Sequence, residues 1–287
     1  MNGIIAAIYA SFTLAIGETS LKKSYRDFEP SIAFMFDAMM GVVFWIPLAL
    51  LFGGSLGNFF IVLPYAIASA ILSEAFYFWA LSKGQLSITA IILSTYPIYT
   101  IGFSYFINQE RLSSGEAIFV GIAIAGTLLS YLPSKLSRKE LKKSGAIIWP
   151  VLAAVAVGFS DTISKTVINK TSAFDFLLAL AVVQLPIALI YLKLEKQSYM
   201  LTMKNVIAAP YDYFHSLVGG LFTVAGTGLL WVSFNYTLAS VAAPIIATSG
   251  ALIVLFATLF LDERMTWKNA LGIAMIFIGV LGISRSI

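Results

Sequence analysis

The sequence predicts an all-α membrane protein whose ten transmembrane helices form two inverted five-helix repeats. Of its 287 residues, 59% are hydrophobic and 11% are charged, and the mean hydropathy is +0.90. Soluble globular domains carry about 25% charged residues, so this composition excludes a water-soluble protein. Apolar runs of about 20 residues recur along the chain, and this length crosses a hydrocarbon core of about 30 Å. One long stretch of the chain also occurs twice.

The repeated stretch is Gly84–Leu128, which aligns without a gap to Thr237–Leu281, 153 positions later. At its centre, Glu110-Arg111 and Glu263-Arg264 occupy the same offset, in a charged turn between two apolar runs. Each pair is followed by an aliphatic and a hydroxyl residue. Shared apolar residues could reflect composition alone, but a shared charged pair is harder to explain in that way. We therefore interpret the two stretches as an internal repeat.

The repeat extends to whole halves of the chain. Pro47 in the second span and Pro186 in the seventh begin similar tetrapeptides. An acid, a threonine and a lysine also recur with one spacing, as Glu18, Thr19 and Lys22 in the first half and as Asp161, Thr162 and Lys165 in the second. The predicted domains are 1–134 and 144–287, joined by a basic linker at 135–143. Because each half crosses the membrane an odd number of times, the second half must enter it upside down.

Connections delimit the ten spans. The first apolar run begins at Asn2 without a basic region or a cleavage site, so we expect a retained helix and not a signal peptide. A Gly-rich turn, Phe52–Asn58, follows the second span. Short links at Ser82–Leu86, at Tyr236–Ser240 and at the two Glu-Arg turns force neighbouring helices to be antiparallel. The predicted spans are 3–21, 31–52, 60–82, 86–107, 114–132, 146–168, 173–193, 211–238, 240–261 and 267–285.

Two five-helix repeats, each with a Glu-Arg turn and a Gly-rich last helix, resemble the EamA-type transporters of the drug/metabolite transporter superfamily. The lysines that end spans 1 and 6 and the prolines Pro97 and Pro244 in spans 4 and 9 also match. The resemblance implies a central cavity between spans 3, 4, 8 and 9. It also implies transport of small metabolites such as amino acids, nucleotide sugars, sugar phosphates, choline-like cations or drugs. This chain has Asp37 where the family often has an arginine, so a role in anion binding is not carried over.

Ionisable side chains inside spans are candidate functional residues, because each costs at least about 2.5–3.5 kcal/mol unless it faces water or the bundle interior. Glu74 is the deepest acid, about 12 Å from the end of its helix, and Asp37 lies about 10 Å from its own. Glu74 is expected either to bind substrate or a proton, or to serve as a structural acid hydrogen-bonded to a neighbouring helix. Its repeat counterpart is Thr227, which is uncharged.

Two acid–lysine pairs, Glu18 with Lys22 and Asp161 with Lys165, are four residues apart on one helical face. Opposite charges at this spacing can pair. Each pair either neutralises itself near the membrane interface or joins Asp37 in a charge network along the transport pathway.

Uncharged polar and aromatic residues in the spans form a second set of candidates. They either line the cavity implied by the resemblance, or form interfacial belts and helix–helix contacts. Trp79 nearly matches Trp231 in the repeat, and Gln184 is alone near the middle of span 7. Together with Glu74, the predicted substrate-binding residues are Trp79, Tyr96, Tyr99, Trp231, Asn235, Thr248 and Ser249.

Several classes of function are excluded. The chain has no cysteine and a single histidine, His215, so it offers neither thiolate ligands nor a histidine-based metal site. It has no Gly-rich phosphate loop, and Asp37 and Asp161 are expected to approach from opposite membrane faces, so they cannot form an aspartyl dyad. We therefore expect no enzymatic activity, no cofactor and no metal, and no nucleic-acid partner, because basic residues do not form a stripe with aromatic residues.

The sequence thus predicts a secondary transporter in the cytoplasmic membrane that moves a small organic metabolite by alternating access. An amino acid or an amine is the expected substrate, and export the expected direction. Proton-coupled efflux of lipophilic cations is the alternative within transport, and a non-transporting scaffold or receptor is the alternative outside it. The expected partners are the substrate and the lipid bilayer, and the expected state is a monomer or a weak homodimer.

Orientation is not settled by charge. The loops after the odd-numbered spans carry fourteen Lys and Arg residues, and the opposite side carries four. The positive-inside rule places the fourteen in the cytoplasm and both termini outside. The resemblance implies the opposite orientation, with both termini inside.

Overall fold

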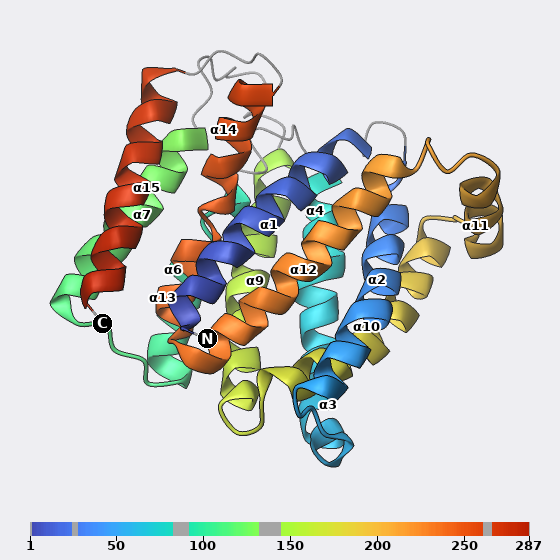
Figure 1. The fold of residues 1–287 in the computed structure, drawn as a ribbon, viewed down its shortest axis with the longest axis horizontal. Helices are drawn as coiled ribbons and strands as arrows, with labels where there is room; N and C mark the ends of the chain where they lie inside the picture. The colour runs from blue at the N-terminus through green and yellow to red at the C-terminus, as the bar shows by residue number, and fades with distance from the viewer. Residues whose placement is uncertain (1, 25–27, 83–91, 132–144, 261–265, 287) are drawn as a thin grey trace.

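The computed structural model describes residues 2–24, 28–82, 92–131, 145–260 and 266–286 (Figure 1). Within these ranges the chain forms helices and the turns between them, and no strand. The prediction of an all-α fold is confirmed.

Each of the ten predicted spans contains a helix or a run of consecutive helices. In the first half these are α1 (Gly3–Ser24), α2 (Pro30–Leu51), the continuous series α3 (Phe59–Ser69), η2 (Ala70–Ala75) and α4 (Phe76–Ser82), then α6 (Tyr96–Ile107) and α7 (Ser114–Tyr131). In the second half they are α9 (Gly145–Ile168), α10 (Ala173–Leu194), α12 (Phe214–Tyr236), the pair α13 (Ala239–Ile246) and α14 (Ser249–Phe260), and α15 (Trp267–Ser286). Two shorter elements, η1 (Leu56–Asn58) and α11 (Tyr199–Ala208), lie between spans.

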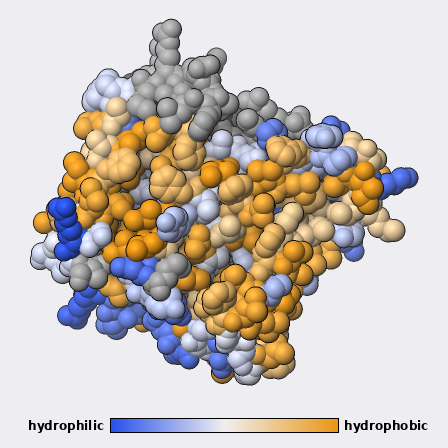
Figure 2. Space-filling view, in the orientation of Figure 1, coloured by the Kyte–Doolittle hydropathy of each residue, from blue (hydrophilic) through white to orange (hydrophobic). Residues whose placement is uncertain are grey.

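The outer surface is suited to lipid. Seven of the described helical segments are long and apolar enough to cross a membrane, and two shorter apolar segments, Ser114–Ser130 and Ala239–Ile253, accompany them. Figure 2 shows hydrophobic residues over much of one face of the molecule. Large apolar side chains such as Leu51 and Phe60 are about four-fifths exposed, at 81% and 80%. Apolar side chains this exposed are stable in hydrocarbon and costly in water, so the chain is an integral, multi-pass membrane protein.

Contacts between helices follow the repeat. α1 packs along α12, and its counterpart α9 packs along α3, η2 and α4. α6 contacts α9, and α13 and α14 correspondingly contact α1. The pairs α2–α10 and α7–α15 join helices that the repeat maps onto each other. Figure 1 shows α1 and α12 running side by side and α7 paired with α15 at one edge. Each of these contacts between helices therefore has a counterpart between the repeat-related helices, as a two-fold relation between the halves requires.

The α7–α15 pair depends on close backbone approach. A Cβ added to Gly272 would lie 2.6 Å from the carbonyl oxygen of Gly126, and one added to Gly126 would lie 2.7 Å from that of Gly272. Small residues of this kind let transmembrane helices pack closely where no hydrophobic effect drives their association.

Gly272→Ala is therefore expected to destabilise the protein by about 2–3 kcal/mol, because the new methyl group meets backbone atoms that cannot move independently. The melting temperature in detergent should fall. Gly121→Ala on α7 is the matched control, because its Cβ would meet no atom within 4 Å. Equal melting temperatures for the two variants would contradict the close packing.

Two features of the fold were not predicted from the sequence. The region between spans 7 and 8 contains α11, a short helix whose Met200, Leu201 and Ile207 are exposed. A helix of 10 residues is too short to span a bilayer, so the search for apolar runs of spanning length did not detect it.

The second feature is a pair of helix interruptions at repeat-related positions in spans 4 and 9. A turn at Ser94-Thr95 precedes α6, and a turn at Ala247-Thr248 separates α13 from α14. In both, the threonine hydroxyl donates to the carbonyl oxygen three residues earlier, at 2.6 Å. A hydroxyl bonded to its own helix backbone competes with the regular ladder and favours a bend.

Candidate functional site

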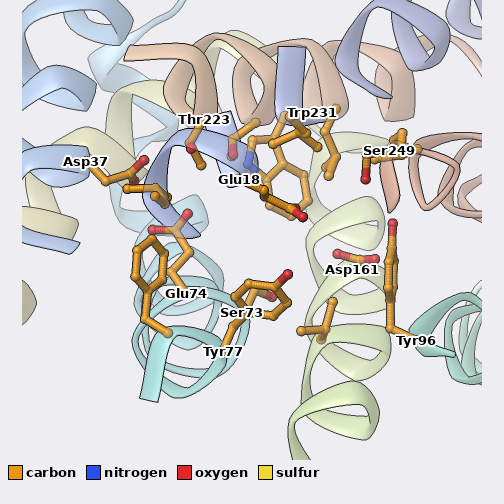
Figure 3. A pocket seen from close by; sticks show the side chains of 17 residues that line it. Glu18, Asp37, Ser73, Glu74, Tyr77, Tyr96, Asp161, Thr223, Trp231 and Ser249 are labelled. Atoms are coloured by element: carbon orange, nitrogen blue, oxygen red, sulfur yellow. The ribbon is translucent and has the colours of Figure 1, made fainter. Parts of the chain in front are cut away.

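A central cavity of about 140 Å³ lies where the two halves meet (Figure 3). A cavity of about 150 Å³ is known to bind a benzene-sized molecule, so this one can hold a small organic ligand. Its lining comes from α1, α2, η2, α4 and α6 of the first half and from α9, α12, α13 and α14 of the second. The 17 lining residues are Leu14, Glu18, Leu21, Asp37, Ser73, Glu74, Tyr77, Phe78, Tyr96, Val157, Asp161, Thr223, Thr227, Leu230, Trp231, Ile246 and Ser249.

The cavity is lined by equivalent positions of the two halves. Twelve of its lining residues form six pairs at equivalent positions of the repeat. The pairs are Leu14 with Val157, Glu18 with Asp161, Glu74 with Thr227, Tyr77 with Leu230, Phe78 with Trp231, and Tyr96 with Ser249. Tyr96 and Ser249 are also the first residues of α6 and α14, directly after the two helix interruptions. Both halves thus present the same positions to one central space, as inverted-repeat transporters do at their substrate sites.

Acidic side chains dominate the charge of the cavity. Glu18, Asp37, Glu74 and Asp161 line it, and none of the 17 described lining residues is Lys, Arg or His. Asp37, Glu74 and Asp161 are buried, while Glu18 is partly exposed. In the view of Figure 3, Asp37 and Glu74 lie on one side, Asp161 lies near Tyr96 and Ser249 on the other, and Glu18 is between them. Asp37 and Asp161, which were expected to approach from opposite membrane faces, border the same cavity, and in this view they lie on different sides of it.

Gln184 links two of these acids. Its side-chain amide is fully buried, and its Nε2 donates hydrogen bonds to Asp37 Oδ2, at 2.8 Å, and to Glu74 Oε2. Glu74 belongs to the π-helical element η2, which interrupts the regular helix between α3 and α4. Single π-helical turns inside longer helices are frequent at functional sites. Sequence reasoning noted Gln184 as an isolated polar residue but did not connect it to Asp37 or Glu74, because the link depends on how α10 packs against α2 and η2.

Asp161 and Lys165 do not form the predicted ion pair. Asp161 Oδ2 accepts a hydrogen bond from the Thr100 hydroxyl at 3.3 Å, whereas Lys165 Nζ donates to the carbonyl oxygen of Phe234 at the end of α12. The two side chains share a helical face but point to different neighbouring helices. The side chain of Lys22 lies outside the described residues, so its pairing with Glu18 stays a prediction.

Glu110 connects the first half to the second on the side of the membrane where the chain begins, which we call the termini side. Its carboxylate accepts hydrogen bonds from the amides of Ala239, at 3.1 Å, and Ser240, at 2.9 Å, and from the Ser240 hydroxyl at 2.6 Å. It is 7% exposed and lies within electrostatic reach of Lys165. Glu110 therefore caps the start of α13, a helix of the other repeat. Glu263 and Arg264 lie outside the described residues.

Comparison with known families agrees with this architecture. The model of the EamA-like transporter family matches residues 1–132 and 144–285, nearly the whole chain in two consecutive matches. The chain belongs to this family. Membership confirms the resemblance drawn from the sequence and identifies the chain as a membrane transporter.

Two relatives resemble this EamA-like transporter over nearly its full length, and a third resembles about half of it. An uncharacterised transporter of Archaeoglobus fulgidus is 22% identical over 98% of this chain and 97% of its own. One from Clostridium kluyveri is 23% identical over 96% of this chain and 89% of its own. An uncharacterised protein of Methanocaldococcus jannaschii is 27% identical over 141 residues, which are 97% of its own length but 49% of this chain. A solved crystal structure shares the fold, with a TM-score of 0.70 and 14% identity, over 99% of this chain and 98% of its own.

Four of the eight predicted substrate-binding residues of the EamA-like chain line the cavity. Glu74, Tyr96, Trp231 and Ser249 all border it. The Tyr96 hydroxyl donates to the carbonyl oxygen of Ala243 at 3.2 Å, which joins α6 to α13. Trp231 is 2% exposed and packs edge-on against Phe234.

The other four do not border the cavity. Trp79 packs on Phe76 and Trp149, with ring centroids 5.7 and 4.7 Å apart. Tyr99 lies against α9, since a Cβ added to Gly158 would be 2.6 Å from Tyr99 Cβ. Asn235 Oδ1 accepts from the Ala173 amide at 3.1 Å and anchors the start of α10. Thr248 lies 2.8 Å from the Ser11 hydroxyl and borders a separate, mostly apolar cavity of about 70 Å³.

A one-residue offset explains the error at Trp79. The repeat places Phe78, and not Trp79, at the position of Trp231, and Phe78 does line the cavity. One residue rotates a side chain by about 100° around a helix, so an approximate match points to the wrong face. Strict use of the offset would have identified Phe78 from the sequence.

The described residues show no arrangement of three or more His, Asp or Glu side chains that could hold a metal ion. Three neutral polar atoms at the cavity or beside its acids, Ser73 Oγ, Trp231 Nε1 and Gln184 Oε1, are buried without a partner among the described residues and are better suited to hydrogen bonds with an organic ligand or water.

Proposed function

We propose that this EamA-like transporter is a secondary transporter that exports a small organic amine, or an amino acid through its ammonium group, by alternating access. The observation that carries the proposal is the cavity with four carboxyl groups and no cationic side chain among its described lining residues. A buried carboxylate without a counter-charge is costly, so a cation that enters this space gains more than a neutral or anionic molecule.

The aromatic lining supports the same class of substrate. Tyr77, Phe78, Tyr96 and Trp231 all border the cavity. The face of an aromatic ring attracts a desolvated ammonium group by up to about 2 kcal/mol. Cation binding by carboxylates and ring faces together also accommodates quaternary ammonium ions, which cannot donate a hydrogen bond. A substrate hydroxyl or carboxylate would find donors in Ser73 Oγ and Trp231 Nε1, which are buried and have no partner in the described part of the chain.

The position of the cavity supports alternating access. It lies between halves whose contacts exchange under the repeat, and Glu110 joins those halves on the termini side. Rocking one half against the other around a fixed central site would move access from one membrane side to the other. A substrate that stabilises neither end state preferentially can then cross in either direction along its gradient.

Transport by purified protein in liposomes tests the proposal. Choline is a suitable first probe, because its fixed charge prevents leakage across the lipid. We expect uptake of labelled choline that putrescine, lysine and unlabelled choline inhibit, and that glutamate and a nucleotide sugar do not. Inhibition by glutamate or the nucleotide sugar, without inhibition by the amines, would overturn the assignment of a cationic substrate.

Efflux of lipophilic cations is the second candidate, favoured by the aromatic residues of the lining. The cavity volume of about 140 Å³ argues for smaller molecules. Tetraphenylphosphonium in the same competition assay separates the two, since it should compete only if the site expands well beyond its present size.

Phe78→Leu is expected to weaken choline binding about fivefold, because leucine keeps the apolar volume but removes an aromatic face worth about 1 kcal/mol. The matched control is Trp79→Leu, one residue later and outside the cavity lining. The Kd of choline, measured by the concentration dependence of thermal stabilisation, should change only in the first variant. If Trp79→Leu weakens binding as much as Phe78→Leu, the placement of the ligand is wrong.

A further inference from the structure

Asp37, Gln184 and Glu74 form a compact polar unit on one side of the cavity. The two hydrogens of one amide nitrogen are shared between two carboxyl groups, one on α2 and one on η2. The second oxygens of both carboxyl groups, Asp37 Oδ1 and Glu74 Oε1, are buried and have no partner among the described residues. Native proteins rarely leave such atoms unpaired, so these two oxygens require an explanation.

The charge of the unit is the main difficulty. Asp37 and Glu74 interact electrostatically, and the amide between them is neutral. If both were ionised, two negative charges would share one neutral donor in a buried site, which is the arrangement that makes a pair of carboxyl groups retain one proton. A single proton on either of the unpartnered oxygens would remove this repulsion and supply a donor.

The surroundings contain no alternative counter-charge among the described residues. The titratable groups that face the unit from neighbouring elements are Glu18 of α1 and Asp161 of α9, together with the phenols Tyr77 of α4 and Tyr96 of α6. From α10, Gln184 donates to both acids. α3 ends directly before η2 with the buried Ser69 hydroxyl. Further acids add negative potential, which favours binding of a proton.

The unit exists in one half only. The repeat places Thr227 at the position of Glu74 and Trp45 at that of Gln184, by the alignment of Pro47 with Pro186. The Trp45 indole donates to the carbonyl oxygen of Val224 at 3.0 Å and is satisfied without an acid. Because the second half folds without such a unit, the fold itself does not require it.

We propose that Asp37, Gln184 and Glu74 form a binding site for one exchangeable proton, and that the ammonium group of the substrate binds near the other two acids of the cavity, Glu18 and Asp161. Both acids border the cavity, so water in the cavity can deliver the proton and remove it. Arrival of a cation near Glu18 and Asp161 raises the local positive potential and favours release of the proton, which couples the two ions in exchange. This coupling rests on the proposed function, whereas the proton site itself does not.

Infrared difference spectroscopy tests the proton site without any substrate. The protein in lipid is titrated from alkaline to acidic pH, and the C=O stretch of protonated carboxyl groups is recorded. We expect Asp37→Asn and Glu74→Gln each to remove the same band, equal to one proton per chain, and the double variant to remove no more. Interacting sites titrate as a pair, so this non-additivity is the signature of a shared proton. Glu116→Gln, at an exposed helix start, is the control and should leave the band intact.

Gln184→Leu provides a second test that retains both acids. Loss of the donated hydrogen bonds should shift the frequency of the same band and not remove it. Additive losses in the two single variants, or a band that neither substitution affects, would overturn the shared site. A band that disappears when sodium is added at constant pH would assign the site to a metal cation and would also overturn the proposal.

Coupling is tested separately in liposomes with choline as the probe. An outward proton gradient should accelerate choline exchange in the parent protein and have no effect in Glu74→Gln. Failure of any choline transport would count against the proposed function and leave the spectroscopic result intact. Choline transport with an unchanged response to pH in Glu74→Gln would overturn the coupling.

Discussion

Asp161→Asn is expected to weaken choline binding at least about 30-fold. This factor corresponds to about 2 kcal/mol of binding free energy, which is the smallest loss usual when one partner of a buried charge pair is removed. Asp161 is 2% exposed and borders the cavity, and from the described residues it accepts one long hydrogen bond, from Thr100 at 3.3 Å. The protein therefore leaves most of its charge for a ligand to compensate. Asparagine keeps the shape and the link to Thr100, so the loss should fall on binding and not on folding.

The measurement is the Kd of choline from its stabilising effect, together with the initial rate of uptake into liposomes. Asp212→Asn is the control, because Asp212 is exposed and precedes α12 outside the span. Its Kd should equal that of the parent. Unchanged choline affinity in Asp161→Asn, with the melting temperature also unchanged, would show that the acids of the cavity do not hold the cation.

Most of the fold could be predicted because the information is local or repeated. Apolar runs of spanning length give the helices, and the offset between Glu110 and Glu263 gives the repeat. The same logic extends to the site, since the recurrence of Glu18 at Asp161 placed two acids that the structure brings to one cavity. Symmetry made this possible, because residues at equivalent positions of a two-fold repeat have equivalent surroundings, so a residue that borders a space on the axis has a counterpart that borders it too.

The parts that were missed depend on side-chain direction or on contacts between distant segments. Gln184 could not be assigned, because nothing near it in the sequence shows that α10 turns it toward Asp37 and Glu74. Thr248 was taken as a cavity residue, but its hydroxyl bonds the backbone of its own bent helix and the Ser11 side chain. In each case the polar residue type indicated a special role. The direction of the side chain, however, depends on helices that are distant in the sequence.

The two helix interruptions are shared by both halves, but the side chains that follow them are not. Thr95 and Thr248 bend their spans in the same way, so that Tyr96 and Ser249 begin new helices at the edge of the cavity. The paired bends are a property of the fold. The side chains that follow them differ, and this difference, like that between Glu74 and Thr227, gives the two sides of the cavity different chemistry. We therefore expect selection of the substrate to depend on the positions at which the halves have diverged.

Glu110→Gln is expected to shift the conformational equilibrium away from the state described here by about tenfold or more. Hydrogen bonds to a charged group contribute about 1.5–3 kcal/mol each, and the Glu110 carboxylate accepts three, from two amides and a hydroxyl of the first turn of α13. Glutamine loses the charge and one acceptor oxygen, and it also deprives Lys165 of a nearby negative charge. Since these contacts join the two halves, their loss should open the termini side of the cavity.

The absence of cysteine makes this measurable. Thr227→Cys introduces one thiol in the cavity lining, and an impermeant maleimide is applied to either side of sealed vesicles. Labelling from the termini side should accelerate in Glu110→Gln, while labelling from the other side slows, because one state gains population at the expense of the other. Glu116→Gln, on the same side and partly exposed, should label as the parent does. Faster labelling from both sides would indicate general loosening, and unchanged labelling would show that Glu110 caps α13 without controlling access.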